Sequence, residues 1–374
     1  MKSIENIDLP IASPGAGRSL RVMRYGMPGK GPKVYIQAGL HADEAPGFLV
    51  AHHLEQLLDS LDVLGEIVLV PVANPIGLGQ WRDEFLQGRF DFANSVNFNR
   101  QHLNLTEKIA ARAESLLGDD ADINIAIIRK CTADVLKEVH PADEAGALKK
   151  ILFSLAHDAD IVLDLHCDYD AIMHVYMGTP LWPEGADLAA QMGAEVTLLA
   201  EKSGGDPFDE ACSRLWWDLA KRFPAHSIPS ACLSATIELR GIADTDHRVA
   251  LQDARNIISF LQRRKVVEGA APQLPQLLNE ATPLTGVDYI KAEAPGVVVF
   301  LKEPGEYVTR NDVVAEIINP LPKKGESPVL AVRCKTDGVL FSRNYDRFAR
   351  PGRVLAKIAG KEALRDPEES LLTV

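Results

Sequence analysis

The chain has 374 residues, of which 46% are hydrophobic and 25% charged, close to the average for a soluble globular protein. Its 52 acidic and 40 basic residues give a formal net charge of -12, which argues against a nucleic-acid partner because phosphates are bound by clustered Lys and Arg. No stretch approaches the roughly 18 uncharged apolar residues of a membrane span, and the N-terminus has no signal-peptide core. The five cysteines are scattered without a pairing pattern. We therefore expect a cytoplasmic protein with neither a nucleic-acid nor a membrane partner, and homo-oligomerisation is left open.

The first part of the chain, residues 1–270, alternates short β-rich runs with longer helical patterns. In chain order the pattern predicts a strand over 33–38, a helix from Glu44 to about Asp59 with Asp43 as its N-cap, strands over 66–72, 159–165 and 235–239, and a helix over 246–264. Residues 105–157 favour two or three helices carried between strands. The strands are apolar without clean alternation, as expected when both faces of a sheet are covered, so we predict an α/β layered domain.

A segment rich in Pro, Ala and Gly, residues 269–286, separates this region from a different one. From about 285 to 374 the chain consists of short apolar runs separated by Gly turns, and strands are expected near 296–301, 313–318, 331–334, 337–341 and 351–358. This pattern predicts a small all-β barrel or sandwich domain.

Candidate metal ligands follow two of the predicted strands. His41 and Glu44 lie where the chain turns from strand to helix, and a His-x-x-Glu pair can offer a nitrogen and a carboxylate to zinc. His166 follows the strand that ends near Leu165. Open α/β sheets bind ligands at the carboxyl ends of their strands, so His41, Glu44 and His166 could form a three-ligand zinc site with one position left for water. The alternative is that His166 only caps its strand through local hydrogen bonds.

Two further features of the sequence could take part in the chemistry. Glu238 lies within an otherwise apolar strand, where an unpaired carboxylate is costly. It could pair with Arg240 or another cation, or it could act as a general base with a raised pKa. The dipeptide Asn99-Arg100 could hold a substrate carboxylate, although by itself it is an ordinary loop sequence.

Taken together, GLHADE, VPVANPIG, NFNR, DLHCD and TIELRG occur in the order found in the succinylglutamate desuccinylase/aspartoacylase family of the zinc carboxypeptidase clan, which the chain resembles over about residues 30–265. The resemblance implies a three-layer α/β/α zinc-carboxypeptidase-like domain with a mixed sheet. It also implies one zinc ion held by His41, Glu44 and His166, with Glu238 as general base and Asn99-Arg100 as the clamp for a substrate carboxylate. A second substrate-binding Arg usually precedes the Asn-Arg motif in this family, and both Arg82 and Arg89 are candidates.

The expected function is zinc-dependent hydrolysis of the amide bond of an N-acylated small amino acid, which releases a carboxylate and a free amine. A metallocarboxypeptidase acting on peptides would use the same residues. A non-catalytic binding protein on a hydrolase fold would be expected to have lost a ligand or the base, whereas all four residues are present. In the resembling deacylases the β-rich domain restricts the active site, and we expect residues 285–374 to do the same here.

Overall fold

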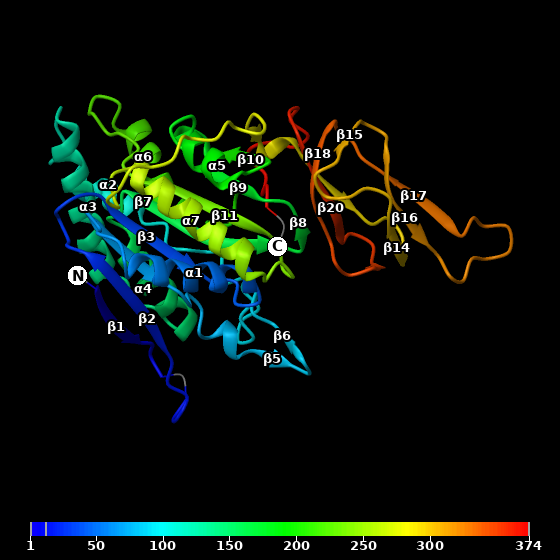
Figure 1. Cartoon of the computed structure of the whole chain (residues 1–374), viewed down its shortest axis with the longest axis horizontal. Helices are drawn as coiled ribbons and strands as arrows, with labels where there is room; N and C mark the ends of the chain where they lie inside the picture. Colours follow the sequence, from blue (N-terminus) through cyan, green and yellow to red (C-terminus); the bar gives the residue numbers. More distant parts are fainter. Residues whose placement is uncertain (1, 12, 373–374) are drawn as a thin grey trace.

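The computed structural model describes residues 2–11 and 13–372. The larger part of the chain is built on a nine-stranded mixed sheet (Figure 1). In spatial order its strands are β1 (Lys2–Asp8), β2 (Ser19–Gly26), β4 (Glu66–Val70), β3 (Lys33–Ala38), β7 (Ile161–Asp168), β11 (Leu233–Gly241), β9 (His174–Gly178), β10 (Val196–Ala200) and β12 (Thr282–Pro283). The central strands β4, β3, β7 and β11 are parallel to one another, whereas β2 and β9 pair antiparallel at either side.

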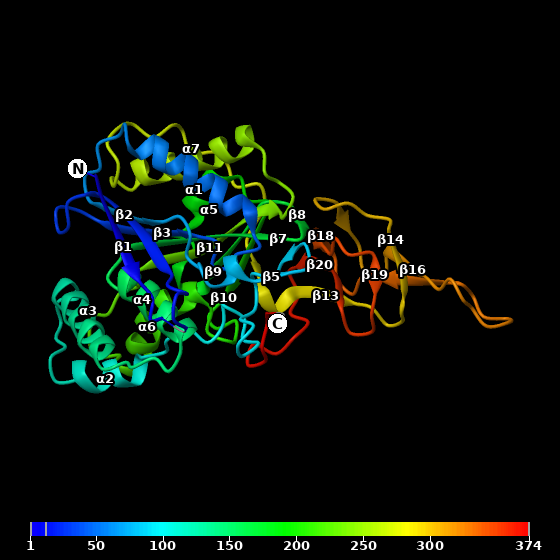
Figure 2. The ribbon, with the colours of Figure 1, turned by 90° about the horizontal axis from the view of Figure 1, so that it is seen from below.

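Helices cover both faces of this sheet (Figure 2). One layer contains α1 (Ala45–Leu58), α5 (Ala186–Met192) and α7 (His247–Arg263), and the other contains α2 (Thr106–Ala113), α3 (Ala121–Lys137), α4 (Glu144–Ala156) and α6 (Phe208–Arg222). The predicted three-layer α/β/α domain with a mixed sheet is therefore confirmed, and residues 105–157 form three helices.

The core explains why the strands lack a clean alternation of polar and apolar residues. Successive strand residues point to opposite faces, and here both faces are buried: Val34 and Ile36 belong to the apolar cluster beneath α1 and α7, while Tyr35 belongs to the cluster on the other side. The N-terminal strands β1 and β2 were not predicted. β1 is a polar, mostly exposed edge strand, and β2, which pairs with it, has one exposed and one buried face.

The C-terminal region contains two further antiparallel sheets. One consists of β13 (Val287–Lys291), β20 (Val354–Gly360), β18 (Gly338–Arg343) and β15 (Tyr307–Val308), and the other of β17 (Val329–Arg333), β16 (Val313–Ile318), β14 (Gly296–Phe300) and β19 (Phe348–Ala349). Their facing side chains form a separate apolar core that includes Val298, Val314 and Leu340. The small all-β domain expected after the linker is therefore present.

The two regions are joined by more than the linker. The short strand β8 (Asp170–Ala171) pairs with β18, and β12 extends the large sheet just before the C-terminal strands begin. A remaining hairpin, β5 (Trp81–Arg82) and β6 (Phe85–Leu86), projects away from the sheet. Figures 1 and 2 both show the all-β part at one end of an elongated molecule, beside the end of the sheet near β8.

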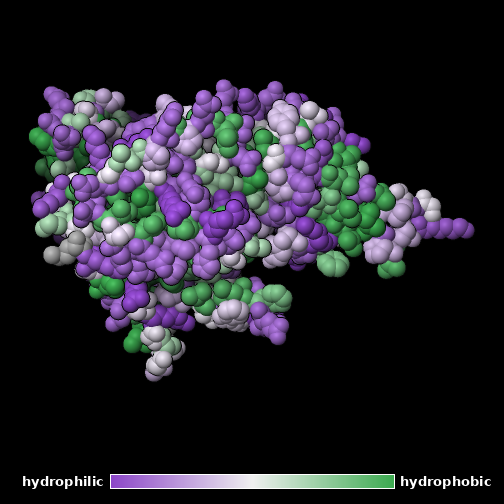
Figure 3. Space-filling view, viewed as in Figure 1, coloured by the Kyte–Doolittle hydropathy of each residue, from purple (hydrophilic) through white to green (hydrophobic). Residues whose placement is uncertain are grey.

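The outer sheet of the β domain carries exposed apolar side chains. Val299 of β14, Leu330 of β17 and Phe348 of β19 are exposed. Figure 3 shows an apolar area in green over this part of the molecule. Homo-oligomerisation stays a prediction. Among the residues that the structure describes, no helix has the length and apolar character of a membrane span.

Candidate active site

The turn between β3 and α1 positions His41 and Glu44. Gly39 has a φ of +70° and lies against the Phe48 ring so closely that a Cβ atom there would clash with it. The helix begins at Ala45, so Glu44, and not Asp43 as predicted, occupies the N-cap position. Glu44 makes no side-chain cap hydrogen bond, because its carboxylate turns instead toward the two histidines.

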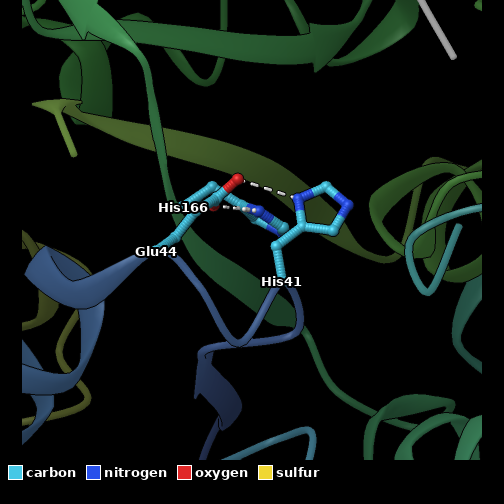
Figure 4. A group of neighbouring side chains, drawn as sticks. All are labelled: His41, Glu44 and His166. Atoms are coloured by element: carbon cyan, nitrogen blue, oxygen red, sulfur yellow. Dashed lines mark hydrogen bonds and ion pairs between the residues drawn. The ribbon is translucent and has the colours of Figure 1, made fainter. Parts of the chain in front are cut away.

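His41, Glu44 and His166 are brought together as predicted, and all three side chains are buried (Figure 4). The His41 Nδ1 lies 2.9 Å from Glu44 Oε1, and the His166 Nδ1 lies 2.8 Å from Glu44 Oε2. One ligand atom from each residue lies within 4.8 Å of the others. Two imidazole nitrogens and a carboxylate in this arrangement suit a zinc ion that retains an open position.

Each histidine is oriented from its far side by a buried polar group. His41 Nε2 lies 2.8 Å from Asn97 Oδ1, and His166 Nε2 lies 3.0 Å from the Asp164 carboxylate. Asp164 in turn accepts a hydrogen bond of 2.9 Å from Gln37 Nε2. Histidines that bind a metal are typically fixed in this way, with one ring nitrogen turned inward and the other bonded to a carboxylate or carbonyl oxygen.

Strand β7 differs from its prediction at this point. It was expected to end at Leu165, but it continues to Asp168, so His166 belongs to the strand and does not follow it. The reason is that β11 pairs with β7 this far, placing Glu238 opposite His166 and Gly241 opposite Asp168. The alternative reading of His166 as a strand cap therefore does not apply.

The surroundings shift the pKa values of Glu44, His41 and His166 in different ways. Burial opposes ionisation of Glu44, but its interactions with His41, His166 and Arg89 outweigh the effect of burial and hold the Glu44 pKa well below its usual range. Burial and the nearby Arg89 charge lower the pKa of His41 to about 4. Burial also disfavours the charged form of His166, yet Asp164 and Glu44 together raise its pKa well above the usual value. Glu44 is thus held ionised, as a metal ligand must be.

Glu238 lies beside this cluster on β11. Burial and the Glu44 charge raise its pKa to about 8, and its Oε2 has no hydrogen-bond partner in the described part of the chain. Arg240, which the sequence offered as a partner, contacts Asp253 instead. Glu238 therefore lines the pocket as a carboxyl group that forms no direct ion pair with a Lys or Arg among the described residues, although His166 and Lys357 are close enough to oppose the rise in its pKa.

The segment after β6 places the guanidinium groups of Arg89 and Arg100 in the pocket. Arg89 contacts Glu44 and lies over the Tyr169 ring, whereas Arg82 is exposed on the β5–β6 hairpin. Of the two candidates for the second site arginine, the structure therefore puts Arg89 at the cluster. Arg100 also lines the pocket, where burial and the Arg89 charge lower its pKa.

Asn99 was predicted to help bind a substrate carboxylate, but its side chain also holds parts of the protein together. Its Oδ1 accepts a hydrogen bond of 2.9 Å from the Phe208 backbone N–H at the start of α6, and its Nδ2 lies 3.4 Å from His166 Nε2. The side chain thus connects His166, the Asn99-Arg100 loop and the start of α6.

These side chains open into one cavity of about 840 Å³, which is shared by both parts of the chain. His41, Arg100 and Glu238 line one side, and Tyr289 and Lys357 of the β domain line another. Lys357 forms an ion pair with Asp168 at the end of β7, and burial of Lys357 is offset by this partner, so its pKa is raised. Sequence reasoning did not find Lys357, because a lone Lys in a β-strand carries no sign that it faces another domain.

Comparison with known proteins shows the family to which the chain belongs. Residues 30–263 match the model of the succinylglutamate desuccinylase/aspartoacylase catalytic domain, so the chain belongs to this family. A curated relative from Halomonas elongata, N-alpha-acetyl-L-2,4-diaminobutyric acid deacetylase, is 26% identical over 338 residues, which cover 88% of this chain and 83% of the relative.

Two solved structures of family members are similar over almost the whole chain. The protein from Shewanella amazonensis has a TM-score of 0.87 at 29% identity and covers 96% of this chain and 99% of its own. The protein from Shewanella frigidimarina has a TM-score of 0.85 at 25% identity and covers 96% of this chain and 97% of its own. The likeness therefore includes the β domain, which lies outside the matched catalytic region.

Proposed function

We propose that the chain is a zinc-dependent hydrolase that cleaves the amide bond of an N-acylated small amino acid, using one zinc ion per chain. The observation that carries the proposal is the convergence of three ligand atoms within 4.8 Å, beside a carboxyl group whose pKa is raised. Family membership and the deacetylase activity in the name of the Halomonas relative support the same reaction type.

His41, Glu44 and His166 would hold the zinc ion, with Asn97 and Asp164 fixing the two imidazole rings. Bound zinc would supply Lewis acidity, which lowers the pKa of water and polarises the scissile carbonyl. The other steps belong to the protein's own side chains.

Glu238 would act as general base and then as general acid. Its Oε2 would accept a proton from the attacking water and return it to the nitrogen of the leaving amine. Its Oε2 is available for this exchange because it lines the cavity and has no hydrogen-bond partner among the described residues. Arg89 would stabilise negative charge developing on the carbonyl oxygen, and Arg100, together with Asn99, would bind the substrate carboxylate.

The position of the β domain helps to decide whether the substrate is a small N-acyl amino acid or a peptide. Lys357 and Tyr289 of the β domain line the same cavity as the His41, Glu44 and His166 cluster, and Lys357 forms an ion pair with Asp168 of the catalytic domain. A wall fixed in this position would leave room for an N-acyl amino acid but obstruct a polypeptide, so it favours the deacylase over the metallocarboxypeptidase.

A substrate panel tests the proposal. Zinc-loaded protein is incubated with N-acetyl, N-succinyl and N-formyl amino acids, and the released amine is measured beside metal-free protein and Glu238→Gln. We expect amine release from at least one small substrate that needs both zinc and Glu238. Hydrolysis of C-terminal peptide bonds in place of these substrates would favour the carboxypeptidase, and zinc binding without any hydrolysis would favour the non-catalytic protein.

A further inference from the structure

The chain returns to the catalytic part after β20. Residues 361–372, which we call the strap, are drawn in red at the junction of the two parts in Figure 2. The Leu364 N–H donates a hydrogen bond of 2.9 Å to the Thr285 carbonyl near the start of the β domain. Further along, the Leu371 N–H donates one of 2.7 Å to the Ser203 carbonyl of the catalytic part. The segment between these contacts is mostly exposed, so the strap is held at its two ends.

Leu371 anchors the far end of the strap. Its exposed fraction is only 1%, and it belongs to an apolar cluster with Val196 and Leu198 of β10 and Phe341 of β18. Ser203, which accepts its N–H, lies in the segment between β10 and α6. Leu371 therefore ties the strap to the apolar junction of the two parts and to the segment that precedes α6.

That segment contains two adjacent glycines, Gly204 and Gly205, with φ values of +90° and +81°. Glycine adopts such values readily and leaves the backbone great freedom, so neighbouring groups must hold this turn in place. A Cβ atom on Gly204 would lie 3.0 Å from Ser370 Cα in the strap, and one on Gly205 would lie 2.8 Å from Arg100 Cδ. The turn is therefore enclosed between the strap and the Arg100 side chain.

The same turn also holds the backbone that follows Arg100. The Gln101 N–H donates a hydrogen bond of 2.6 Å to the Gly205 carbonyl, and the His102 N–H donates one of 2.9 Å to the Asp206 carbonyl. Gln101 has a φ of +56°, a conformation that a residue with a side chain keeps only where its surroundings impose it. A displacement of the turn would therefore be passed on to Arg100.

We propose that the strap positions Arg100 for the substrate carboxylate, with Leu371 as the positioning residue. This inference rests on the proposed deacylase function and adds a determinant of substrate binding to it. Leu364 and Ser370 of the strap line the same cavity as Arg100, so the strap also forms part of the pocket wall. The contacts of Leu371 described above involve neither the metal ligands nor Glu238. Its loss should therefore affect substrate binding more than the chemical step.

Leu371→Ala removes most of the anchoring side chain. For the zinc-loaded full chain we expect KM for N-acetyl amino acids to rise about tenfold and kcat to change less than about threefold, because the carboxylate is held equally in the ground state and the transition state. The α-amides of the same substrates lack the carboxylate, so their KM should change less than about twofold. The matched control is Leu340→Ala, which truncates a fully buried Leu in the core of the β domain, outside the cavity lining, and should leave KM unchanged.

A double-variant cycle shows whether Leu371 acts through Arg100. If it does, adding Leu371→Ala to Arg100→Lys should raise KM by less than about twofold, since the contact that the strap positions is already impaired. An undiminished rise in the Arg100→Lys background would overturn the proposal, and so would equal losses for the acids and their α-amides.

Amide hydrogen exchange, followed by mass spectrometry, separates this inference from the proposed function because it needs no substrate. In Leu371→Ala the amides of Gln101 and His102 should exchange at least about tenfold faster than in the unchanged protein, whereas Leu340→Ala should leave them protected. Unchanged exchange in folded Leu371→Ala would overturn the role of the strap while the deacylase function stands. Faster exchange in a protein that cleaves no N-acyl amino acid would instead refute the deacylase function and still support the hold of the strap on the Arg100 loop. If Leu371→Ala does not fold, the smaller truncation Leu371→Val takes its place, and exchange there within about 20% of the unchanged protein overturns the proposal.

Discussion

Asp164 provides a sharp test of how the metal site is held. Its side chain is fully buried and reaches His166 Nε2 at 3.0 Å while accepting the Gln37 amide at 2.9 Å. Asp164→Asn preserves the size of the side chain and its capacity to accept one hydrogen bond, but it removes the negative charge behind the imidazole ring. His166 should then be a weaker and less firmly oriented ligand.

The expected loss follows from the nature of that contact. Removing the outer partner of a metal-ligating histidine typically weakens metal affinity by about 10–100-fold, which corresponds to about 1.4–2.7 kcal/mol. Because Asp164 is fully buried and no water can replace its charge, we expect a result nearer the upper end of this range.

The assay is a competition titration of zinc between the protein and a chromophoric chelator at fixed pH. The control is Asp158→Asn, in which the replaced carboxylate is 40% exposed and pairs with Lys33 before β7 begins. Thermal melting of the metal-free proteins shows whether each variant is folded. If folded Asp164→Asn binds zinc within about twofold of the unchanged protein, Asp164 does not tune the ligand and the reasoning is wrong.

Four further predictions follow from the same geometry. His166→Ala should abolish stoichiometric zinc binding, measured by elemental analysis, and an unchanged zinc content would remove His166 from the ligand set. Glu238→Gln should lower kcat by about 10²–10⁴-fold while zinc stays bound, since it removes only the base; an unchanged kcat would exclude that role. Arg100→Lys should slow turnover of carboxylate-bearing substrates much more than of their amidated analogues, because Lys lacks the planar fork; equal losses would assign Arg100 elsewhere. Burial and the Lys149 charge hold the pKa of His102 well below 6.5, so below that pH the unfolded chain takes up a proton that the folded chain refuses. Stability should therefore fall by up to about 1.4 kcal/mol per pH unit below 6.5 in urea titrations, and His102→Leu should reduce this slope.

The metal-ligand cluster could be predicted because it depends on local features. His41 and Glu44 lie in a single strand-to-helix turn, and His166 lies near the end of a strand recognisable by its apolar run. Parallel strands bring their carboxyl ends to one edge of the sheet, so three residues spread over more than a hundred positions could be expected to meet.

The residues around the cluster depend on contacts that the sequence does not reveal. Arg82 and Arg89 were equivalent candidates, and the choice is made by Gly88, whose carbonyl accepts the Ala42 N–H at 3.1 Å and whose Cα approaches the Asp43 backbone too closely for a side chain. Asp164 carried a signal that was available, because it is a buried acid in an apolar strand, as Glu238 is. The prediction ended the strand at Leu165 and considered the residues that follow it, whereas β7 continues to Asp168 and both Asp164 and His166 belong to the strand.

Glu44 and Glu238 show how one residue type can take two roles within one site. Burial alone would raise the pKa of both carboxyl groups, and it does so for Glu238, whose pKa reaches about 8. Glu44 differs because His41, His166 and Arg89 surround it and reverse the effect of burial. The ionised Glu44 also raises the pKa of Glu238, since a second negative charge nearby is disfavoured. Two carboxyl groups whose surroundings push their pKa values apart suit a permanent anion and a proton carrier, and the geometry supports assigning the first role to the metal ligand and the second to the base.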